Sequence, residues 1–194
     1  MSANPSTSLT LLQRLRASEQ DAWDRLLHLY TPLVRSWCSH QGVRGADSDD
    51  LVQEVFQAVL TGLPQFQRDR PGDTFRGWLR GITRHKLLDF FRRQSSQPRA
   101  QGGTAASQQL QQVPQPEICL PEETPQEVAG LYQRAIEFVR GEFEEKTWRA
   151  FWRTAVDGQS PAETAAELSM SAAAVRMAKS RVLHRLRQEI GDVS

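Results

Sequence analysis

The feature that most constrains the fold of this chain is a stretch near its C-terminus with two successive helix-start signals. Ser160 is followed by Pro161 and Glu163, the order expected for an N-cap serine, a proline at the first helical position and a capping box. Ser171 supplies a second N-cap after a short Leu-Ser-Met segment. Small and apolar residues lie between the caps, where two helices would approach closely. The stretch therefore predicts a helix-turn-helix, whose second helix would enter the DNA major groove.

The second of these helices is predicted to have one apolar stripe and one basic face. Its apolar residues recur at three- and four-residue spacing: Val175, Ala178, Val182, Leu186 and Ile190. The opposite arc holds Ala173, Arg176, Met177, Ser180, Arg181, His184 and Arg187. Between Ser171 and Arg187 there are five Lys or Arg and no Asp or Glu. A basic face is often only a solvated surface, but its coincidence with two caps favours DNA binding.

The distribution of charge along the chain matters more than its sum. The formal net charge of the 194 residues is +1, which by itself does not suggest a nucleic-acid partner. Basic residues nevertheless gather in the predicted recognition helix and in residues 76–93, where Asp89 is the only acid. Acidic residues cluster over 47–54 and 117–127. This pattern predicts a protein that contacts DNA at two points and also binds something basic.

Composition disfavours several other classes of protein. No apolar run approaches the roughly 20 residues of a membrane span, and the N-terminus lacks a signal-peptide pattern, so we expect a cytoplasmic protein without membrane insertion. Cys38 and Cys119 are expected to be unpaired, and neither has the neighbours of a zinc site. We therefore expect no metal and no cofactor. The four histidines lie in unrelated contexts and no carboxylate cluster suggests a two-metal site, which argues against an enzyme.

Helical periodicity extends over most of the chain, and no convincing strand is found. It predicts helices over residues 9–17, 19–40, 47–60, 74–93, 124–141 and 144–156, in addition to the helix-turn-helix. Asp47 or Ser48 is expected to cap the third helix, and Pro32 to kink the second. Residues 94–121 are rich in Gln, Pro, Gly, Ser and Ala and predict a flexible linker.

The expected fold class is therefore all-α, with two small helical domains joined by a flexible linker. The predicted boundaries are 1–93 for the first domain, 94–123 for the linker and 124–194 for the second domain.

Two motifs at a fixed distance carry a resemblance to a known family. One is the run Asp-Asp-Leu-Val-Gln-Glu-Val-Phe over residues 49–56, and the other is Phe-Arg-Gly-Trp-Leu-Arg-Gly-Ile-Thr-Arg-His-Lys over 75–86. Together they resemble region 2 of bacterial sigma-70 family factors, while the linker and terminal helix-turn-helix resemble region 4. With no third domain between them, the layout is similar to that of the extracytoplasmic-function (ECF, group 4) subfamily. The resemblance covers nearly the whole chain after about residue 10.

The resemblance implies a sigma factor that binds core RNA polymerase, directs it to −10 and −35 promoter elements and promotes promoter melting. It implies polymerase contacts at Asp50, Leu51, Gln53, Glu54 and Phe56. Carboxylate and amide groups suit an arginine-rich coiled coil, whereas capping alone would account for Asp47 and Asp49 but not for the acid and amide one turn further on. An anti-sigma factor is a further implied partner, and the expected state is a monomer.

The resemblance also places DNA contacts in both domains. For the −10 element it implies Arg76, Trp78, Arg80, Arg84 and Lys86, together with a loop whose Phe66, Gln67 and Arg68 would capture an extruded base. For the −35 element the candidates are Ser171, Ala173, Arg176, Met177, Lys179, Ser180, Arg181 and Arg187. Among the basic residues of that helix, Lys179, Arg185 and Arg187 are expected on phosphates.

Two points depart from or extend this pattern. Ser-Ala-Ala-Ala precedes Val175 where family members often have a glycine, and Trp148 and Trp152 make the preceding helix rich in aromatic residues, so the −35 sequence is left open. Glu117, Glu122 and Glu123 of the linker could line basic channel walls of the polymerase as nucleic-acid mimics. The alternative function is a stand-alone helix-turn-helix repressor or activator, which would bind its operator without polymerase.

Overall fold

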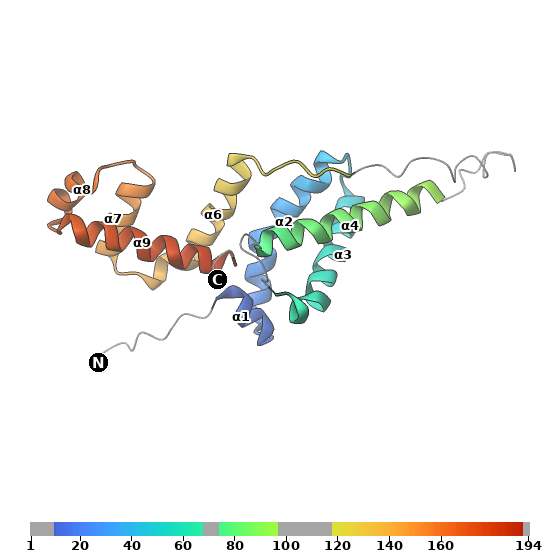
Figure 1. The fold of residues 1–194 in the computed structure, drawn as a ribbon, viewed down its shortest axis with the longest axis horizontal. Coiled ribbons are helices and arrows are strands. Elements are labelled where there is room, and N and C mark those ends of the chain that lie inside the picture. The colour runs from blue at the N-terminus through green and yellow to red at the C-terminus, as the bar shows by residue number, and fades with distance from the viewer. Residues whose placement is uncertain (1–9, 68–73, 97–117, 192–194) are drawn as a thin grey trace, which may run out of the picture. The chain divides into compact units, whose positions relative to one another are not determined.

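The protein is all-α over the residues that its computed structural model describes, 10–67, 74–96 and 118–191 (Figure 1). No strand occurs in these ranges, which confirms the fold class. The helices are α1 (Leu11–Arg16), α2 (Gln20–His40), α3 (Ala46–Gly62), the 3-10 helix η1 (Leu63–Gln65), α4 (Phe75–Ser96), α6 (Pro125–Val139), the 3-10 helix η3 (Arg140–Glu142), α7 (Glu145–Ala155), α8 (Pro161–Leu168) and α9 (Ala172–Glu189). None of these helices combines the length and apolarity needed to cross a bilayer.

The chain divides into two compact units. One, the C-terminal unit, contains Met1–Leu29 together with Thr124–Ser194, and the other contains Tyr30–Glu123. The division falls within α2, which runs without interruption past Pro32. Among the described residues, 10–29 thus group by packing with the C-terminal helices.

The unit of residues 30–123 is built around α3, α4 and the second half of α2. An aromatic cluster lies at its centre: the Phe75 ring lies 5.3 Å from that of Tyr30 and 6.0 Å from that of Phe66, which in turn lies 4.7 Å from Trp78. Gly62 ends α3 beside this cluster, and a Cβ there would lie 3.0 Å from the Trp78 ring. A side chain at Gly62 would therefore displace the indole.

The start of α3 differs from the expectation. The N-cap is Gly45, with φ of 61°, and not Asp47 or Ser48. Glycine adopts this left-handed backbone without the cost that a Cβ imposes, so the helix begins earlier than the polar residues suggested. Ser48 is instead buried at 6% exposure, within hydrogen-bonding reach of the Cys38 thiol.

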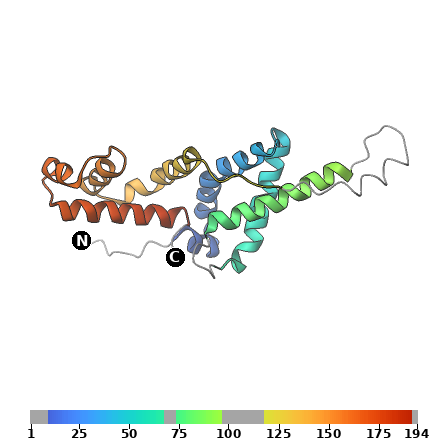
Figure 2. The ribbon, with the colours of Figure 1, turned by 45° about the horizontal axis from the view of Figure 1, so that its top comes forward.

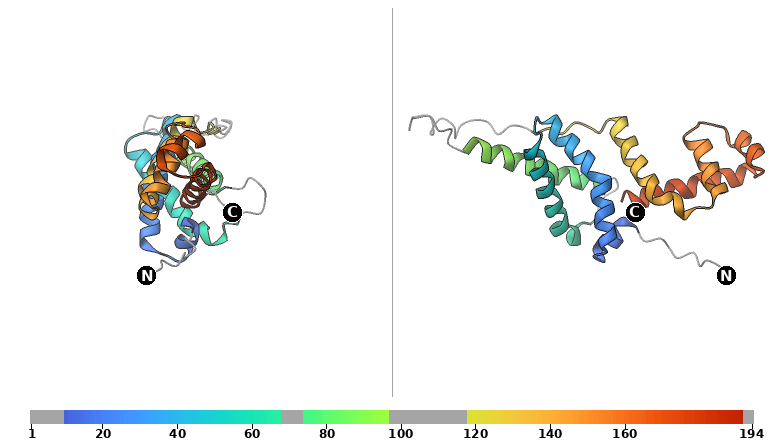
Figure 3. Two further views of the ribbon diagram at one scale, coloured as in Figure 1. Left: turned by 90° about the vertical axis from the view of Figure 1, so that its left-hand side faces the viewer. Right: turned by 180° about the vertical axis from the view of Figure 1, so that it is seen from behind.

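The C-terminal helices confirm the predicted helix-turn-helix. Thr124 and Ser160 each form a capping box, with Glu127 and Glu163, and the hydrogen bonds from Ser160 lower the pKa of Glu163. The Ser171 hydroxyl accepts from the Ala174 amide at 3.1 Å and caps α9. Within this unit α9 packs against α6, α7 and α8 (Figure 3). The whole predicted apolar stripe, from Val175 to Ile190, is buried.

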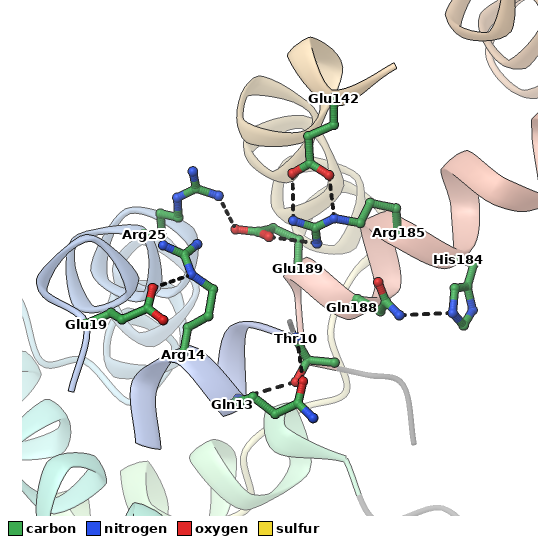
Figure 4. Close-up of polar contacts among 10 residues, drawn as sticks. All are labelled: Thr10, Gln13, Arg14, Glu19, Arg25, Glu142, His184, Arg185, Gln188 and Glu189. Carbon is green, nitrogen blue, oxygen red and sulfur yellow. Dashed lines mark hydrogen bonds and ion pairs between the residues drawn. The ribbon is translucent and has the colours of Figure 1, made fainter. Parts of the chain in front are cut away.

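A buried ionic network fixes the C-terminal end of α9 (Figure 4). Glu189 has no exposed side-chain surface and accepts from Arg25 Nη1 at 3.1 Å. Its other oxygen lies 2.9 Å from Arg185 Nη1, and Arg185 also makes two hydrogen bonds to Glu142, at 2.6 and 2.7 Å. Burial favours the neutral form of Arg185, but the two carboxylates outweigh it and raise its pKa above the ordinary value.

The two cysteines are free and lie in different environments. Cys38 is fully buried, and this burial raises its pKa to about 11. Cys119 is exposed. The two thiols should therefore differ strongly in reactivity, because the thiolate is the reactive form.

We expect Glu189→Ala to lower the free energy of unfolding of the C-terminal unit by about 3 kcal/mol, because Arg25 and Arg185 each lose a carboxylate partner in a buried site. Arg187→Ala, which alters an exposed residue of the same helix, should change it by less than about 0.5 kcal/mol. Urea unfolding followed by circular dichroism measures both. Equal midpoints for the two variants would show that the buried network contributes nothing.

In the folded protein at pH 8, we expect only one thiol to react rapidly with a chromogenic disulfide reagent. That thiol is Cys119, because on the order of one in a thousand Cys38 side chains is ionised at this pH and the residue is buried. The fast phase should disappear in Cys119→Ser, and a second thiol should react after unfolding in urea. Rapid reaction of two thiols in the native protein would contradict the buried position of Cys38.

Candidate nucleic-acid and partner interfaces

The first candidate interface is the outer face of α9. Its predicted arc is exposed at every position described above: Ala173, Arg176, Met177, Ser180, Arg181, His184 and Arg187. Ser171 at the helix start is exposed as well. Met177 is 61% exposed and provides an apolar surface suited to the methyl group of thymine.

Two basic residues of α9 are held by the protein itself. Lys179 is half-buried, and its Nζ donates to the Thr154 carbonyl at 3.2 Å. Arg185, which the sequence placed on phosphates, is 7% exposed and bound to Glu142 and Glu189, so that expectation was wrong. Its spacing from Ala178 and Val182 assigns it to the buried stripe, and this signal was available in the sequence.

Side chains from α7 fix the turn between α8 and α9. Lys146 Nζ donates to the Ser169 carbonyl at 3.1 Å, and Ser169 adopts the left-handed conformation with φ of 49°. Arg153 bonds Glu167 of α8 at 2.8 Å. A small core that includes Ala150, Ala165 and Val175 lies beneath these contacts. The orientation of α9 within its unit is thus held by both apolar packing and ionic contacts.

The second candidate interface is the arginine face of α4, formed by Arg76, Arg80 and Arg84. These residues follow one another at four-residue spacing along the helix, as predicted. The structure places an extended segment, residues 118–123, against them: Arg84 Nε donates to the Ile118 carbonyl at 2.7 Å. Arg80 donates to two carbonyls of the segment, and Arg76 lies 3.4 Å from the Glu123 carboxylate.

Three of the other residues proposed for the −10 element, Phe66, Trp78 and Lys86, are less accessible than the sequence suggested. Phe66 is 6% exposed and packs in the aromatic cluster with Trp78, which is half-buried. Lys86 Nζ lies 3.7 Å from the Glu54 carboxylate. Gln67 is exposed, and Arg68 lies outside the described residues. The Phe66 ring therefore has a structural role in this conformation.

The third candidate interface is the solvent face of α3. Asp50 and Gln53 are exposed on it, whereas Leu51 and Phe56 are buried at 2% and 7% exposure. Glu54 is half-buried and bonds Arg93 at 2.9 Å. Of the five residues that the sequence placed here, only Asp50 and Gln53 are exposed to solvent.

Sequence reasoning missed two members of this face. Gln57 is exposed, and Leu60 is 53% exposed, although it is a large apolar residue. Both follow Asp50 and Gln53 at helical spacing, and this periodicity could have identified them. The solvent face of α3 thus consists of polar side chains with one exposed leucine at its end.

The linker acids have separate environments. Glu123 pairs with Arg76, Glu122 is exposed, and Glu117 lies outside the described residues. Within the described ranges, no group of three or more His, Cys, Asp or Glu residues is arranged to hold a metal ion.

Comparison with known proteins identifies the family to which this architecture belongs. The Sigma-70 region 2 family model matches residues 26–97, which extend from α2 to the region after α4. The chain is 33% identical over 186 residues to the ECF RNA polymerase sigma factor SigD of Mycobacterium bovis and, with the same values, to SigD of Mycobacterium tuberculosis. These alignments cover 90% of this chain and 79% of each relative.

Two solved structures are also similar. One is CnrH in complex with the cytosolic domain of CnrY, at 24% identity and a TM-score of 0.37, covering 91% of this chain and 92% of that one. The other is the RsbN–BldN complex, at 19% identity and a TM-score of 0.36, with 91% and 97% covered. From the region 2 match and the identity to SigD over most of both chains, the protein belongs to the extracytoplasmic-function family of RNA polymerase sigma factors.

Proposed function

We propose that this sigma factor binds core RNA polymerase, directs it to promoters through −10 and −35 elements and promotes melting of the −10 DNA. The observation that carries the proposal is the combination, in one chain of this family, of region 2 with an acid-free helix face displayed by a helix-turn-helix. A stand-alone repressor needs only the second of these features. The occurrence of both favours the sigma factor function over the alternative.

The −35 element is assigned to the exposed face of α9. Arg176 and Arg181 are free of the ionic networks that engage Arg185, so each can make a bidentate contact with a guanine. Met177 and Ser180 lie on the same face, while Arg187 and Lys179 are assigned to phosphates. Ser171 and Ala173 are at the helix start, where the N-terminus of a recognition helix meets base edges.

The −10 element is assigned to α4 and the loop before it. Arg76, Arg80 and Arg84 would bind phosphates, supported by Lys86, while Gln67 and Arg68 would contact a base drawn out of the duplex. Unstacking a base costs on the order of a few kcal/mol, and stacking on an aromatic ring returns about 1–3 kcal/mol. Trp78, which is half-buried, is positioned for stacking, whereas Phe66 would have to leave the aromatic cluster to stack on a base.

Binding of core RNA polymerase is assigned to the solvent face of α3. Asp50 and Gln53 would form charge-assisted and amide hydrogen bonds with a basic coiled coil, and Leu60 would add apolar contact. Leu51 and Phe56 support this face from beneath, since both are buried. An acidic and amide-rich surface suits a basic partner because complementary charges increase the rate and specificity of association.

The remaining assignments follow from membership of the family. We propose functional domains over residues 1–93 and 124–194 with a linker over 94–123, a cytoplasmic location, and a monomer in a one-to-one complex with core polymerase. An anti-sigma factor that competes for these surfaces is the proposed negative regulator. No catalytic activity is proposed.

The function is tested by in vitro transcription with purified core polymerase over a genomic promoter library. We expect a restricted set of promoters that share two short elements. A protein that bound one operator tightly in the absence of core polymerase, and directed no initiation in its presence, would support the repressor instead.

We expect Arg176→Ala and Arg181→Ala each to weaken binding of the holoenzyme to a duplex that carries its −35 element. The expected loss is about 1–3 kcal/mol, or roughly 5- to 150-fold, if each guanidinium contacts a base. Fluorescence anisotropy with specific and scrambled duplexes measures it. Arg149→Ala, which removes an exposed arginine of α7, is the matched control. An equal loss on both duplexes would assign the arginines to phosphates.

We expect Asp50→Lys to weaken association with core polymerase by at least about tenfold, because it places a like charge against a basic partner surface. Asp47→Lys, in the exposed first turn of the same helix, should have a much smaller effect. Competition against a labelled sigma factor for limiting core polymerase measures both variants. If the two substitutions were equally damaging, the solvent face of α3 around Asp50 would not be the site of contact.

A further inference from the structure

An extended segment of the chain covers the arginine face of α4. Residues 118–123 run antiparallel to the helix: Ile118 meets Arg84, Leu120 and Pro121 meet Arg80, and Glu123 meets Arg76. Figure 2 shows this segment as the extended stretch before α6 that passes along α4. The three arginines span about 12 Å of helix and the segment about 16 Å of extended chain, and the long arginine side chains reach the segment at both of its ends.

The segment is anchored by apolar burial as well as by these hydrogen bonds. Ile118 and Leu120 are 2% and 5% exposed, whereas Cys119 between them is exposed. This alternation is that of an extended chain with one face buried. On its other edge the Cys119 carbonyl accepts from Gln41 Nε2 at 3.2 Å. Four consecutive carbonyls, from Ile118 to Pro121, are therefore each bound by a side chain of the same unit.

The groups that the segment presents to the arginines are all acceptors. Backbone carbonyl oxygens meet Arg80 and Arg84, and a carboxylate meets Arg76. A phosphodiester backbone presents the same chemistry, since it offers a row of oxygens that guanidinium groups bind through charge-assisted hydrogen bonds. A guanidinium whose N–H groups point at the segment cannot direct the same N–H groups at a phosphate.

We propose that residues 118–123 form a displaceable strap that covers the DNA-binding face of α4 in the free protein. The strap must dissociate from α4 before that face can bind the −10 strand. The proposal rests on the proposed role of α4 in DNA binding. The strap and the nucleic acid then compete for one surface. Free sigma factor is held in a state of low DNA affinity, and the −10 face becomes available only when the strap is lifted.

The competition has a quantitative consequence. When only a fraction of molecules has an open arginine face, the apparent dissociation constant for DNA is the intrinsic constant divided by that fraction. Releasing the strap should therefore tighten DNA binding without adding any contact. The plot of the logarithm of the binding constant against the logarithm of salt concentration should also become steeper by about 2. Each of three phosphate contacts to a single strand contributes about 0.7 to this slope.

The first test releases the strap with the double substitution Ile118→Ser and Leu120→Ser in the full-length protein. Binding to a fluorescein-labelled single-stranded 20-mer is measured by anisotropy over a series of salt concentrations. We expect affinity about tenfold higher than that of the unaltered protein, with the steeper slope. Cys119→Ser is the matched control, because it alters the exposed side chain of the same segment and should leave affinity unchanged. Thermal unfolding by circular dichroism establishes that each variant is folded.

The second test closes the strap and does not depend on removing buried residues. Gln41→Cys is joined to Cys119 by a short bismaleimide, and Cys38 does not compete because it is buried. We expect the linked protein to bind core polymerase through the exposed face of α3. It should lose at least about tenfold in promoter opening, measured by permanganate footprinting. The same variant with separate monomaleimide adducts is the control. Promoter opening by the linked protein at the control level would overturn the proposal.

A mutant cycle separates failure of the strap from failure of the proposed −10 role. Arg76→Ala, Arg80→Ala and Arg84→Ala are combined in the unaltered and the released chains. We expect the triple substitution to have little effect on DNA affinity when the strap is present and to abolish the gain when it is released. A similar loss in both chains, with no gain on release, would show that α4 binds DNA but is not masked. No effect in either chain would contradict the role of α4 itself.

Discussion

The carboxylate of Glu189 is the group on which the arrangement of the C-terminal unit depends most. It has no contact with solvent, and it joins Arg25 of α2 to Arg185 of α9, while Glu142 completes the set. Removing charge from water costs free energy, and only close pairing offsets that cost. The network therefore tolerates one register of α9 against its neighbours. Because the register of α9 is fixed, its exposed arginines have a fixed orientation relative to α7 and α8.

Some arginines of this chain are bound by other groups of the protein, and others are exposed to solvent. In α9 the buried Arg185 serves the fold, while Arg176 and Arg181 face outward. In α4 the arginines face a segment of the chain itself rather than solvent alone. Net charge treats all these residues alike, and helical periodicity separates only Arg185, which falls on the buried stripe of α9. Their chemical roles are distinguished by their partners, which come from segments distant in sequence.

Local signals in the sequence predicted much of the fold. The capping serines Ser160 and Ser171, the buried stripe of α9 and its exposed arc depend on neighbours within a few residues, and each was found where expected. The errors have a common physical origin in tertiary contact. Arg185 was assigned to phosphates although its spacing placed it on the buried stripe, and nothing in the sequence indicated its partner Glu142, which lies 43 positions away. Leu51 and Phe56 were placed at a binding surface although the packing of α3 buries them. The extended segment on α4 gave no periodic signal.

The close approach of Gly62 to the Trp78 ring restricts how this protein can diversify. The loop assigned to base capture follows Gly62 and the short helix η1, and a Cβ at Gly62 would lie 3.0 Å from the Trp78 ring, so the indole would have to shift by a few tenths of an ångström. The position at which the loop begins is therefore constrained by the indole of Trp78. Altered promoter preference in descendants of this chain would have to arise from substitutions farther along the loop, while the point of departure stays constant.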